Sequence, residues 1–202
     1  MKTFLIGIAG GSGSGKTYLA NKILDTFKDK VLIIQQDSYY KDLSGIEFNK
    51  RNLENFDHPN SIDIKLLKTH ITKLLHGKSI ARPTYSFSKH IRKDQIKTLS
   101  PKPIIIVEGI LILSFKELLN LFSLKIFINI KSDIRFIRRL KRDIKQRNRS
   151  ALDVCRQYLS SVRPMHDKFV KPSKNNSDFI VKSDKDHKNI INIIKHELVK
   201  SL

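Results

Sequence analysis

Apolar residues along the chain follow two spacings, one typical of buried strands and one typical of amphipathic helices. Short continuous runs of isoleucine, leucine and valine predict strands buried on both faces of a parallel sheet. These runs are 4–9, 31–34, 104–107, 124–130 and 179–181. Apolar positions three or four residues apart predict helices at 16–27, 64–76, 111–122, 134–147, 152–162 and 188–202. The alternation predicts an α/β fold, with a parallel five-stranded sheet covered by helices on both faces.

Three stretches depart from this alternation. Residues 38–63 are polar and irregular, but they carry several aromatic side chains, and long loops of this kind are usually functional. Residues 78–99 contain Pro83 and alternate in polarity, which predicts a β-hairpin insertion outside the main sheet. Residues 165–173 are expected to form a connection. The chain length and the absence of repeats favour a single domain over 1–202.

The composition is strongly basic, with 39 lysine and arginine residues against 19 acidic ones and a net charge of +20. Most basic residues are lysines scattered from end to end, without an RNA-binding motif or a zinc-ligand spacing. We therefore expect no dedicated nucleic-acid partner, although the charge keeps a basic nucleic-acid-binding protein as an alternative. The single cysteine, Cys155, and the lack of an apolar run of about 18 residues favour a cytoplasmic protein without a membrane span.

Residues 10–17 match the phosphate-binding loop (P-loop) pattern G-x-x-x-x-G-K-T between a predicted strand and a predicted helix. This context indicates a P-loop NTPase-type fold, with backbone N–H groups that hold phosphate oxygens. Lys16 would reach the terminal phosphates, and Thr17 would offer its hydroxyl to a bound Mg²⁺. The candidate ATP-binding residues of this loop are Gly10, Gly11, Ser12, Gly13, Ser14, Gly15, Lys16 and Thr17.

Two carboxylates follow predicted strands. Asp37 comes after strand 31–34 and Glu108 after strand 104–107, and ligands bind at that edge of a parallel sheet. Glu108 matches the arrangement in which a strand-end acid holds Mg²⁺ directly or through water. The plainer interpretations are a helix or turn cap for Asp37 and a surface acid for Glu108.

The helix 134–147 carries Arg135, Arg138, Arg139 and Arg142 at a spacing that places them on one face. Such a face is often only solvated, but here segment 132–162 could also form an arginine-rich lid that clamps ATP phosphates. No guanine-reading N-K-x-D string has the correct spacing. The residues alone therefore predict a small-molecule phosphotransferase whose acceptor they do not name.

Several strings in order along the chain resemble the uridine kinase (uridine–cytidine kinase) family of P-loop nucleoside kinases. They are GIAGGSGSGKT at 7–17, QQDSYYKD at 35–42, NFDHPNSID at 55–63, PTYSFSKHIR at 83–92, IIIVEGIL at 104–111, RRLKRDIKQRNR at 138–149 and QYLSSVRPMHDKFVKPSK at 157–174. Together they match this family better than the related phosphoribulokinases and pantothenate kinases, which are kept as alternatives. The resemblance implies transfer of the γ-phosphate of ATP or GTP to the 5′-hydroxyl of uridine or cytidine, giving UMP or CMP.

The resemblance also implies roles for individual residues. Asp37 would be the catalytic base, assisted by Lys16 and Arg142, and Asp57 would hold the ribose hydroxyls. The implied nucleoside-binding residues are Asp37, Tyr40, Phe56, Asp57, Tyr85, Phe87, His90, Arg139, Arg149 and Gln157. Arg142 and Arg147 join the ATP-binding set, and Thr17, Glu108 and Asp37 form the Mg²⁺ set.

The chain departs from the family pattern at two places. Asn148 stands where the family usually has glycine, and asparagine tolerates left-handed backbone better than most residues. Residues 182–187 replace a proline-and-glycine turn that contacts the nucleotide base in the family. The resemblance finally implies a homotetramer.

Overall fold

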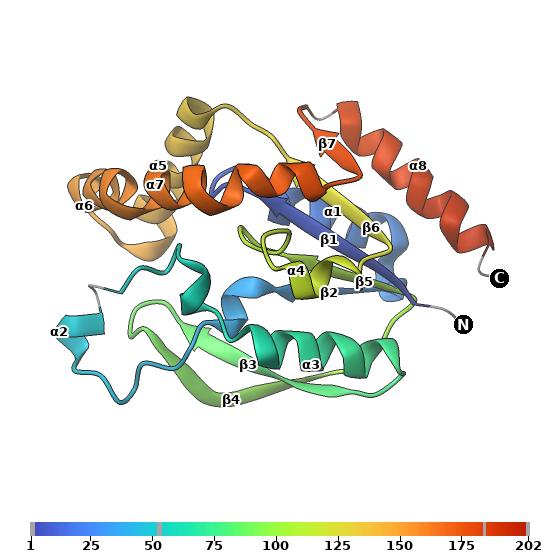
Figure 1. Cartoon of the computed structure of the whole chain (residues 1–202), viewed down its shortest axis with the longest axis horizontal. Helices are drawn as coiled ribbons and strands as arrows, with labels where there is room; N and C mark the ends of the chain where they lie inside the picture. Colours follow the sequence, from blue (N-terminus) through green and yellow to red (C-terminus); the bar gives the residue numbers. More distant parts are fainter. Residues whose placement is uncertain (1–2, 52–53, 184, 201–202) are drawn as a thin grey trace.

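A parallel sheet forms the centre of the computed structural model, which describes residues 3–51, 54–183 and 185–200 (Figure 1). Its five strands lie in the order β2-β5-β1-β6-β7. Their bounds are β1 Phe4–Gly10, β2 Val31–Gln35, β5 Ile104–Glu108, β6 Leu124–Ile128 and β7 Phe179–Val181. The predicted parallel sheet is therefore confirmed, and β1 occupies its middle, so the loop after β1 lies at the centre of the carboxyl edge.

Helices cover both faces of the sheet because each inner strand buries side chains on both sides. In β1, Leu5 and Ala9 belong to one apolar core, and Ile6 and Ile8 belong to the other. The second core packs on α1 (Lys16–Phe27) and α8 (Lys185–Lys200), whereas the first packs on α3 (Ile64–Leu75). These strand side chains are completely buried, which stabilises the fold by roughly 1.5–3 kcal/mol for each large residue.

The predicted β-hairpin is confirmed as a separate antiparallel pair, β3 (Ile80–Ser86) and β4 (Ile91–Leu99). Its register shifts between Arg82 and Thr84, where Pro83 has no N–H for the strand ladder. Arg92 of β4 connects the irregular segment 38–63 to the hairpin through two contacts. Its Nη2 lies 3.0 Å from Asp63 Oδ2, and its Nε donates to the Tyr40 carbonyl oxygen over 2.9 Å.

The irregular segment holds only short helices, α2 (Phe48–Arg51) and a 3₁₀ turn at Pro59–Ser61, and residues 52–53 lie outside the described part. A second 3₁₀ turn, Gln36–Tyr39, follows β2 directly. The segment is therefore ordered by contacts with its neighbours, and it carries its aromatic side chains to the hairpin.

The predicted helix 111–122 is wrong except for one short turn, α4 (Lys116–Leu119). The three apolar residues that suggested its start, Leu111, Ile112 and Leu113, are completely buried in a turn. The Leu111 N–H donates to the Gln36 side-chain oxygen over 2.9 Å instead of entering a helix. A short apolar run does not distinguish a buried turn from a buried helix, and here tertiary burial decided the outcome.

The predicted connection 165–173 is also wrong, because this stretch is helical. α5 (Ser132–Arg147) is followed by α6 (Ala151–Gln157), a π-helical turn at Tyr158–Val162, α7 (Arg163–Met165), a second π-helical turn at His166–Val170 and a 3₁₀ turn at Pro172–Asn176. Pro164 and Pro172 lie within this helical path, although proline lacks the N–H and clashes with the preceding turn of a regular α-helix. The wider π-helical turns before each proline let the helical path continue.

The last helix, α8, begins three residues before the predicted start, and residues 201–202 of the prediction lie outside the described part. Across the described residues, no helix combines the length and apolar character that a membrane crossing would need.

Candidate active site

A cleft of about 1070 Å³ opens at the carboxyl edge of the sheet, between the P-loop, the β3–β4 hairpin and the helices α5 and α6. Its walls bring together most of the residues singled out in the sequence. Those residues are Ser12, Lys16, Thr17, Asp37, Tyr40, Phe56, Asp57, Tyr85, Phe87, His90, Glu108, Arg139, Arg142, Arg147, Arg149 and Gln157. The structure therefore joins segments that are up to 145 residues apart into one cavity with a basic side and an aromatic side.

The P-loop turns sharply between β1 and α1. Gly10, Gly13 and Gly15 have φ values of 147°, 78° and 101°, which only glycine adopts without strain. The loop delivers Lys16 to the cleft at the first position of α1. Its ammonium group donates to the Gly11 carbonyl oxygen over 3.3 Å, and burial lowers the pKa of Lys16 while Glu108 and Asp37 oppose that change. A buried ammonium beside helix N–H groups favours an anion such as phosphate.

The outer side of the P-loop packs against α5 and the π-helical turn at His166–Val170, which the sequence did not reveal. A side chain at Gly11 would collide with the Arg135 guanidinium and approach His166 Nδ1, and one at Gly13 would collide with the Arg135 carbonyl oxygen. Gly10 faces the Ile128 carbonyl oxygen. These three glycines are therefore needed for close packing, and they do not line the cleft.

Three oxygen-bearing side chains gather beside Lys16. Thr17 Oγ1 donates to Glu108 Oε1 over 2.9 Å, and the negative charge of Asp37 acts on Glu108. Burial raises the pKa of Glu108, Asp37 raises it further, and the Lys16 charge opposes both effects. A divalent cation would offset the repulsion between the two carboxylates, and hydroxyl and carboxylate oxygens are ligands that Mg²⁺ prefers. The residues present therefore fit a Mg²⁺ ion.

The opposite wall of the cleft is a cluster of aromatic rings from three segments. Tyr40 lies 5.3 Å from Phe56 and 5.2 Å from Tyr85 between ring centroids, and Phe87 lies 5.8 Å from Tyr85. His90 stacks on Phe56 with centroids 4.7 Å apart, and its φ of 54° aims the ring inward from the hairpin turn. This wall offers flat apolar faces to a planar ligand.

Polar groups accompany this aromatic wall. The buried Tyr85 hydroxyl has no hydrogen-bond partner among the described residues. The Asp57 carboxyl is also buried, and burial raises its pKa while the Arg139 charge lowers it. Buried polar groups normally have a hydrogen-bond partner. The Tyr85 hydroxyl can donate or accept a hydrogen bond with a ligand in the cleft, and the Asp57 carboxylate can accept one.

The arginines of α5 do not all share one surface. Arg139 and Arg142 line the cleft, Arg135 is buried against the P-loop, and Arg138 lines a different pocket. Arg139 bridges the P-loop and the lid, because its Nη1 donates to Ser12 Oγ and its Nη2 donates to Gln157 Oε1, each over 2.9 Å. The four arginines therefore keep their helical spacing, but the helix borders three neighbours, so of these four only Arg139 and Arg142 line the cleft.

The turn after α5 confirms the expectation for Asn148. This residue has φ 50° and ψ 42°, the left-handed conformation, so asparagine serves here without glycine. The turn aims Arg149 back into the cleft, where its Nη1 donates to Gln157 Oε1. Gln157 is thus shared by two arginines.

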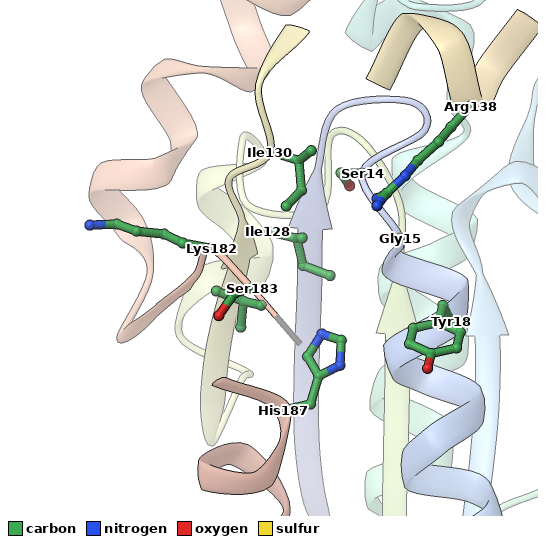
Figure 2. Close-up of a pocket in the computed structure, with 10 residues that line it drawn as sticks. Ser14, Gly15, Tyr18, Ile128, Ile130, Arg138, Lys182, Ser183 and His187 are labelled. Carbon is green, nitrogen blue, oxygen red and sulfur yellow. The ribbon is translucent and has the colours of Figure 1, made fainter. Parts of the chain in front are cut away.

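A second pocket, of about 520 Å³, lies on the other side of the P-loop helix (Figure 2). Figure 2 shows Tyr18 of α1 and His187 of α8 on either side of it, with Arg138 reaching from α5 toward Gly15. The Tyr18 and His187 rings lie 5.8 Å apart, and Ile128, Ile130 and Val181 supply apolar walls.

The segment at residues 182–187 bounds this second pocket. Asp186 Oδ2 accepts hydrogen bonds from the N–H groups of Lys182 and Ser183 over 2.7 and 2.9 Å. A carboxylate cap therefore holds the turn at the place where the family pattern has proline and glycine. In the sequence, this pocket is indicated only by its position after the predicted strand 179–181, because ligands bind beyond the carboxyl ends of parallel strands.

Comparisons with known proteins agree with this geometry. The profile of the Phosphoribulokinase / Uridine kinase family matches residues 5–189. A uridine kinase of Clostridium novyi (strain NT) is 46% identical, over 96% of this chain and 94% of its own. A uridine kinase of Geobacillus kaustophilus (strain HTA426) is 48% identical, over 89% of this chain and 86% of its own. The structure of phosphoribulokinase from Rhodobacter spheroides shares the fold, with a TM-score of 0.64, 16% identity, and coverage of 90% of this chain and 70% of that one.

Proposed function

This chain belongs to the Phosphoribulokinase / Uridine kinase family, and we propose that it is a uridine kinase. It transfers the γ-phosphate of ATP or GTP to the 5′-hydroxyl of uridine or cytidine, and the products UMP and CMP enter pyrimidine salvage. The observation that carries this proposal is the cleft itself. An aromatic wall with Asp57 lies across from Lys16 and the lid arginines, so a flat nucleoside and a triphosphate fit on opposite sides.

The donor triphosphate occupies the P-loop side. Backbone N–H groups at the start of α1 and the Lys16 ammonium hold its β- and γ-phosphates. Arg142 and Arg147 also line the cleft, and they stabilise the charge that develops on the transferring phosphoryl group. The donor base occupies the second pocket, whose apolar walls and Tyr18 ring suit a purine.

Mg²⁺ would be held by Thr17, Glu108 and Asp37, directly or through water, and when bound it neutralises phosphate charge. The hydrogen bond between Thr17 and Glu108 already brings two of these oxygens together. Lys16 and the arginines complete the positive surroundings of the phosphates.

The acceptor nucleoside occupies the aromatic side. Asp57 accepts hydrogen bonds from the two ribose hydroxyls. Burial raises the pKa of its carboxyl, and the Arg139 charge opposes that change. Tyr85 and His90 contact the edge of the pyrimidine, and Tyr40, Phe56 and Phe87 enclose its faces, while Arg149 and Gln157 approach from the lid. Asp37, between the two sides, takes the proton from the 5′-hydroxyl as that oxygen attacks the γ-phosphorus.

We place the enzyme in the cytoplasm, acting on small molecules without a nucleic-acid partner and as a homotetramer. Light scattering coupled to gel filtration tests the assembly. A sugar phosphate or pantothenate is a poorer acceptor than a nucleoside for this cleft, because neither uses an aromatic wall.

The decisive experiment is an acceptor screen with ATP and Mg²⁺. ADP release is measured by a coupled assay, and products are separated by chromatography, with uridine, cytidine, pantothenate and ribulose 5-phosphate as acceptors. We expect turnover with uridine or cytidine and formation of the 5′-monophosphate. Turnover with ribulose 5-phosphate or pantothenate alone would replace this proposal with the related kinase activity, and no turnover with either pyrimidine nucleoside would reject it.

A further inference from the structure

One carboxylate under the lid contacts three of its arginines. Asp143 of α5 has no exposed surface. Its Oδ1 lies 2.8 Å from Nε and Nη2 of Arg142 and 3.7 Å from Nε of Arg147, and its Oδ2 lies 3.4 Å from Nε of Arg139. Asp143 does not line the cleft, so it contacts these arginines on the side that faces away from the cleft.

The contacts use one particular edge of each guanidinium. Arg139 and Arg147 meet Asp143 through Nε, and Arg142 does so through Nε and one terminal nitrogen. A guanidinium has five N–H donors in a fixed plane, so an anchor on the inner edge leaves other donors for a second partner. In Arg139 both terminal nitrogens already donate to cleft residues, Ser12 and Gln157.

The same residue also fixes the turn that follows the helix. The Asp143 carbonyl oxygen accepts the N–H of Asn148, which caps α5, and the N–H of Arg149 over 3.2 Å. Its side chain accepts a hydrogen bond from Arg142 and lies within ion-pair distance of Arg139 and Arg147, and its main chain accepts the N–H of Arg149. Within the described residues, no other carboxylate forms an ion pair with Arg139, Arg142 or Arg147.

Electrostatics explains why a charge is needed here. Arg139, Arg142 and Arg147 repel one another, and burial together with the Arg142 charge lowers the pKa of Arg147, whereas Asp143 opposes this effect. A buried carboxylate is stable only when it is well paired, so the carboxylate and the arginines hold each other in place. Without the carboxylate, repulsion would turn the guanidinium groups toward solvent before any phosphate binds.

We propose that Asp143 is a positioning residue for the phosphoryl transfer, which holds the lid arginines in the orientation that an incoming triphosphate requires. The proposal rests on the proposed kinase function. Pre-organised charges stabilise a transition state because they need not reorganise during the reaction, and a displacement of about 1 Å can lower a rate about a hundredfold.

The test is a double-mutant cycle with Asp143→Asn, which keeps the shape and removes the charge. Alone, it should lower kcat/KM for ATP by about 10- to 100-fold and leave KM for uridine within about threefold. In an Arg142→Ala background, the same change should cost at least about threefold less than it does in the wild type, because the arginine that contacts Asp143 over 2.8 Å is gone while Arg139 and Arg147 remain. Independent, multiplicative losses in the cycle would overturn the proposal, and so would an unchanged kcat/KM in the single variant.

Asp178→Asn is the matched control, since Asp178 also pairs with a basic residue, Lys125 at 3.1 Å, but lies far from the cleft. It should retain wild-type kinetics, and a loss equal to that of Asp143→Asn would show that breaking any ion pair has this effect. Thermal melts compare the folded state of all variants.

A measurement on the wild-type protein tests the positioning role without kinetics. It remains informative if a variant fails to fold or if the wild type has no nucleoside kinase activity. In ¹⁵N-arginine spectra, the Nε–H proton of Arg142 should exchange more slowly than that of the exposed Arg138, and it should shift when ATP alone is added. Exchange as fast as that of Arg138 would overturn the positioning role. A wild type that shows a protected Arg142 Nε–H group but no turnover with nucleosides would reject the proposed function only.

Discussion

The Arg147 guanidinium lies over the ring of Phe87, with 4.7 Å between the guanidinium carbon and the ring centroid. This contact joins the end of the lid helix α5 to the tip of the β3–β4 hairpin, which the sequence separates by 60 residues. Both residues line the cleft, so their contact joins two of its walls. It can form only when the end of α5 and the hairpin tip are close together.

Phe87→Leu keeps an apolar side chain but removes the aromatic face. A cation–π contact is worth about 0.5–2 kcal/mol, so KM for uridine should rise about 2- to 30-fold. Steady-state kinetics with varied uridine at saturating ATP measures the effect. Ile96→Ala is the control, because Ile96 belongs to the same hairpin but is 61% exposed. An unchanged KM in Phe87→Leu would show that the contact has no role in nucleoside binding.

Asp37→Asn removes the proposed base while keeping its size. We expect kcat to fall by about 10²- to 10⁴-fold, whereas the Kd for ATP without a metal ion changes little. Rapid-quench kinetics and calorimetry separate the two quantities. Asp25→Asn, at an exposed position of α1, should be indistinguishable from wild type. If Asp37→Asn turns over normally, the proton has another acceptor.

Thr17→Val removes the hydroxyl that donates to Glu108 while preserving the branched side chain. A hydrogen bond to a charged group contributes about 1.5–3 kcal/mol, so kcat/KM for ATP should fall by about 10- to 100-fold. The Mg²⁺ concentration for half-maximal activity should rise as well. Thr26→Val provides the comparison, since Thr26 lies on the same helix and donates only to the Lys22 carbonyl oxygen. Equal Mg²⁺ dependence in both variants would argue against Thr17 as a metal-site residue.

Asp57→Asn should lower the preference for uridine over 2′-deoxyuridine. A site built to bind a hydroxyl rejects a substrate that lacks it, because its own polar group stays unpaired, and the amide weakens that requirement. The kcat/KM ratio for the two nucleosides measures the preference. A ratio that stays at the wild-type value would remove Asp57 from ribose recognition.

The pH dependence gives a further test of Asp57. Burial raises the pKa of its carboxyl, so on acidification it takes up a proton at a higher pH than an ordinary aspartate. Because the ionised form accepts the ribose hydroxyls, KM for uridine should begin to rise above the usual titration range of aspartate. Asp57→Asn should flatten this rise, and a rise that persists in the variant would assign it to another group.

Stability should also depend on pH through His166, which packs against the P-loop. Burial, with the nearby Arg135 charge, lowers the pKa of His166 from 6.5 to about 4. The folded state then binds fewer protons than the unfolded state, so stability is constant above about pH 6.5 and falls as the pH drops toward 4. The loss is at most about 3.5 kcal/mol, from about 1.4 kcal/mol per pKa unit. His166→Gln should reduce the slope of the unfolding free energy against pH in urea titrations, and an equal slope would exclude His166 as its source.

The strands and the larger amphipathic helices could be predicted from the sequence because their signal is local. Runs such as those of β1 and β5 are buried on both faces, and helices such as α3 keep one apolar side. Predictions failed where the local spacing of apolar residues or prolines did not reflect the contacts made in the folded chain. The apolar residues after Glu108 are buried in a turn, and the prolines after α6 are accommodated by π-helical turns.

The P-loop, the strand-end carboxylates and the family resemblance could be read from the chain alone, because each depends on residue types at fixed spacing in short stretches. Which side chains meet depends on the folded arrangement of the elements. This arrangement separated Arg138 from Arg139 and Arg142, placed Arg135 against Gly11, and buried Asp143 beneath the lid arginines. Helical spacing fixes the direction of a side chain on its own helix, but its partner depends on the neighbours that chain topology brings to each side.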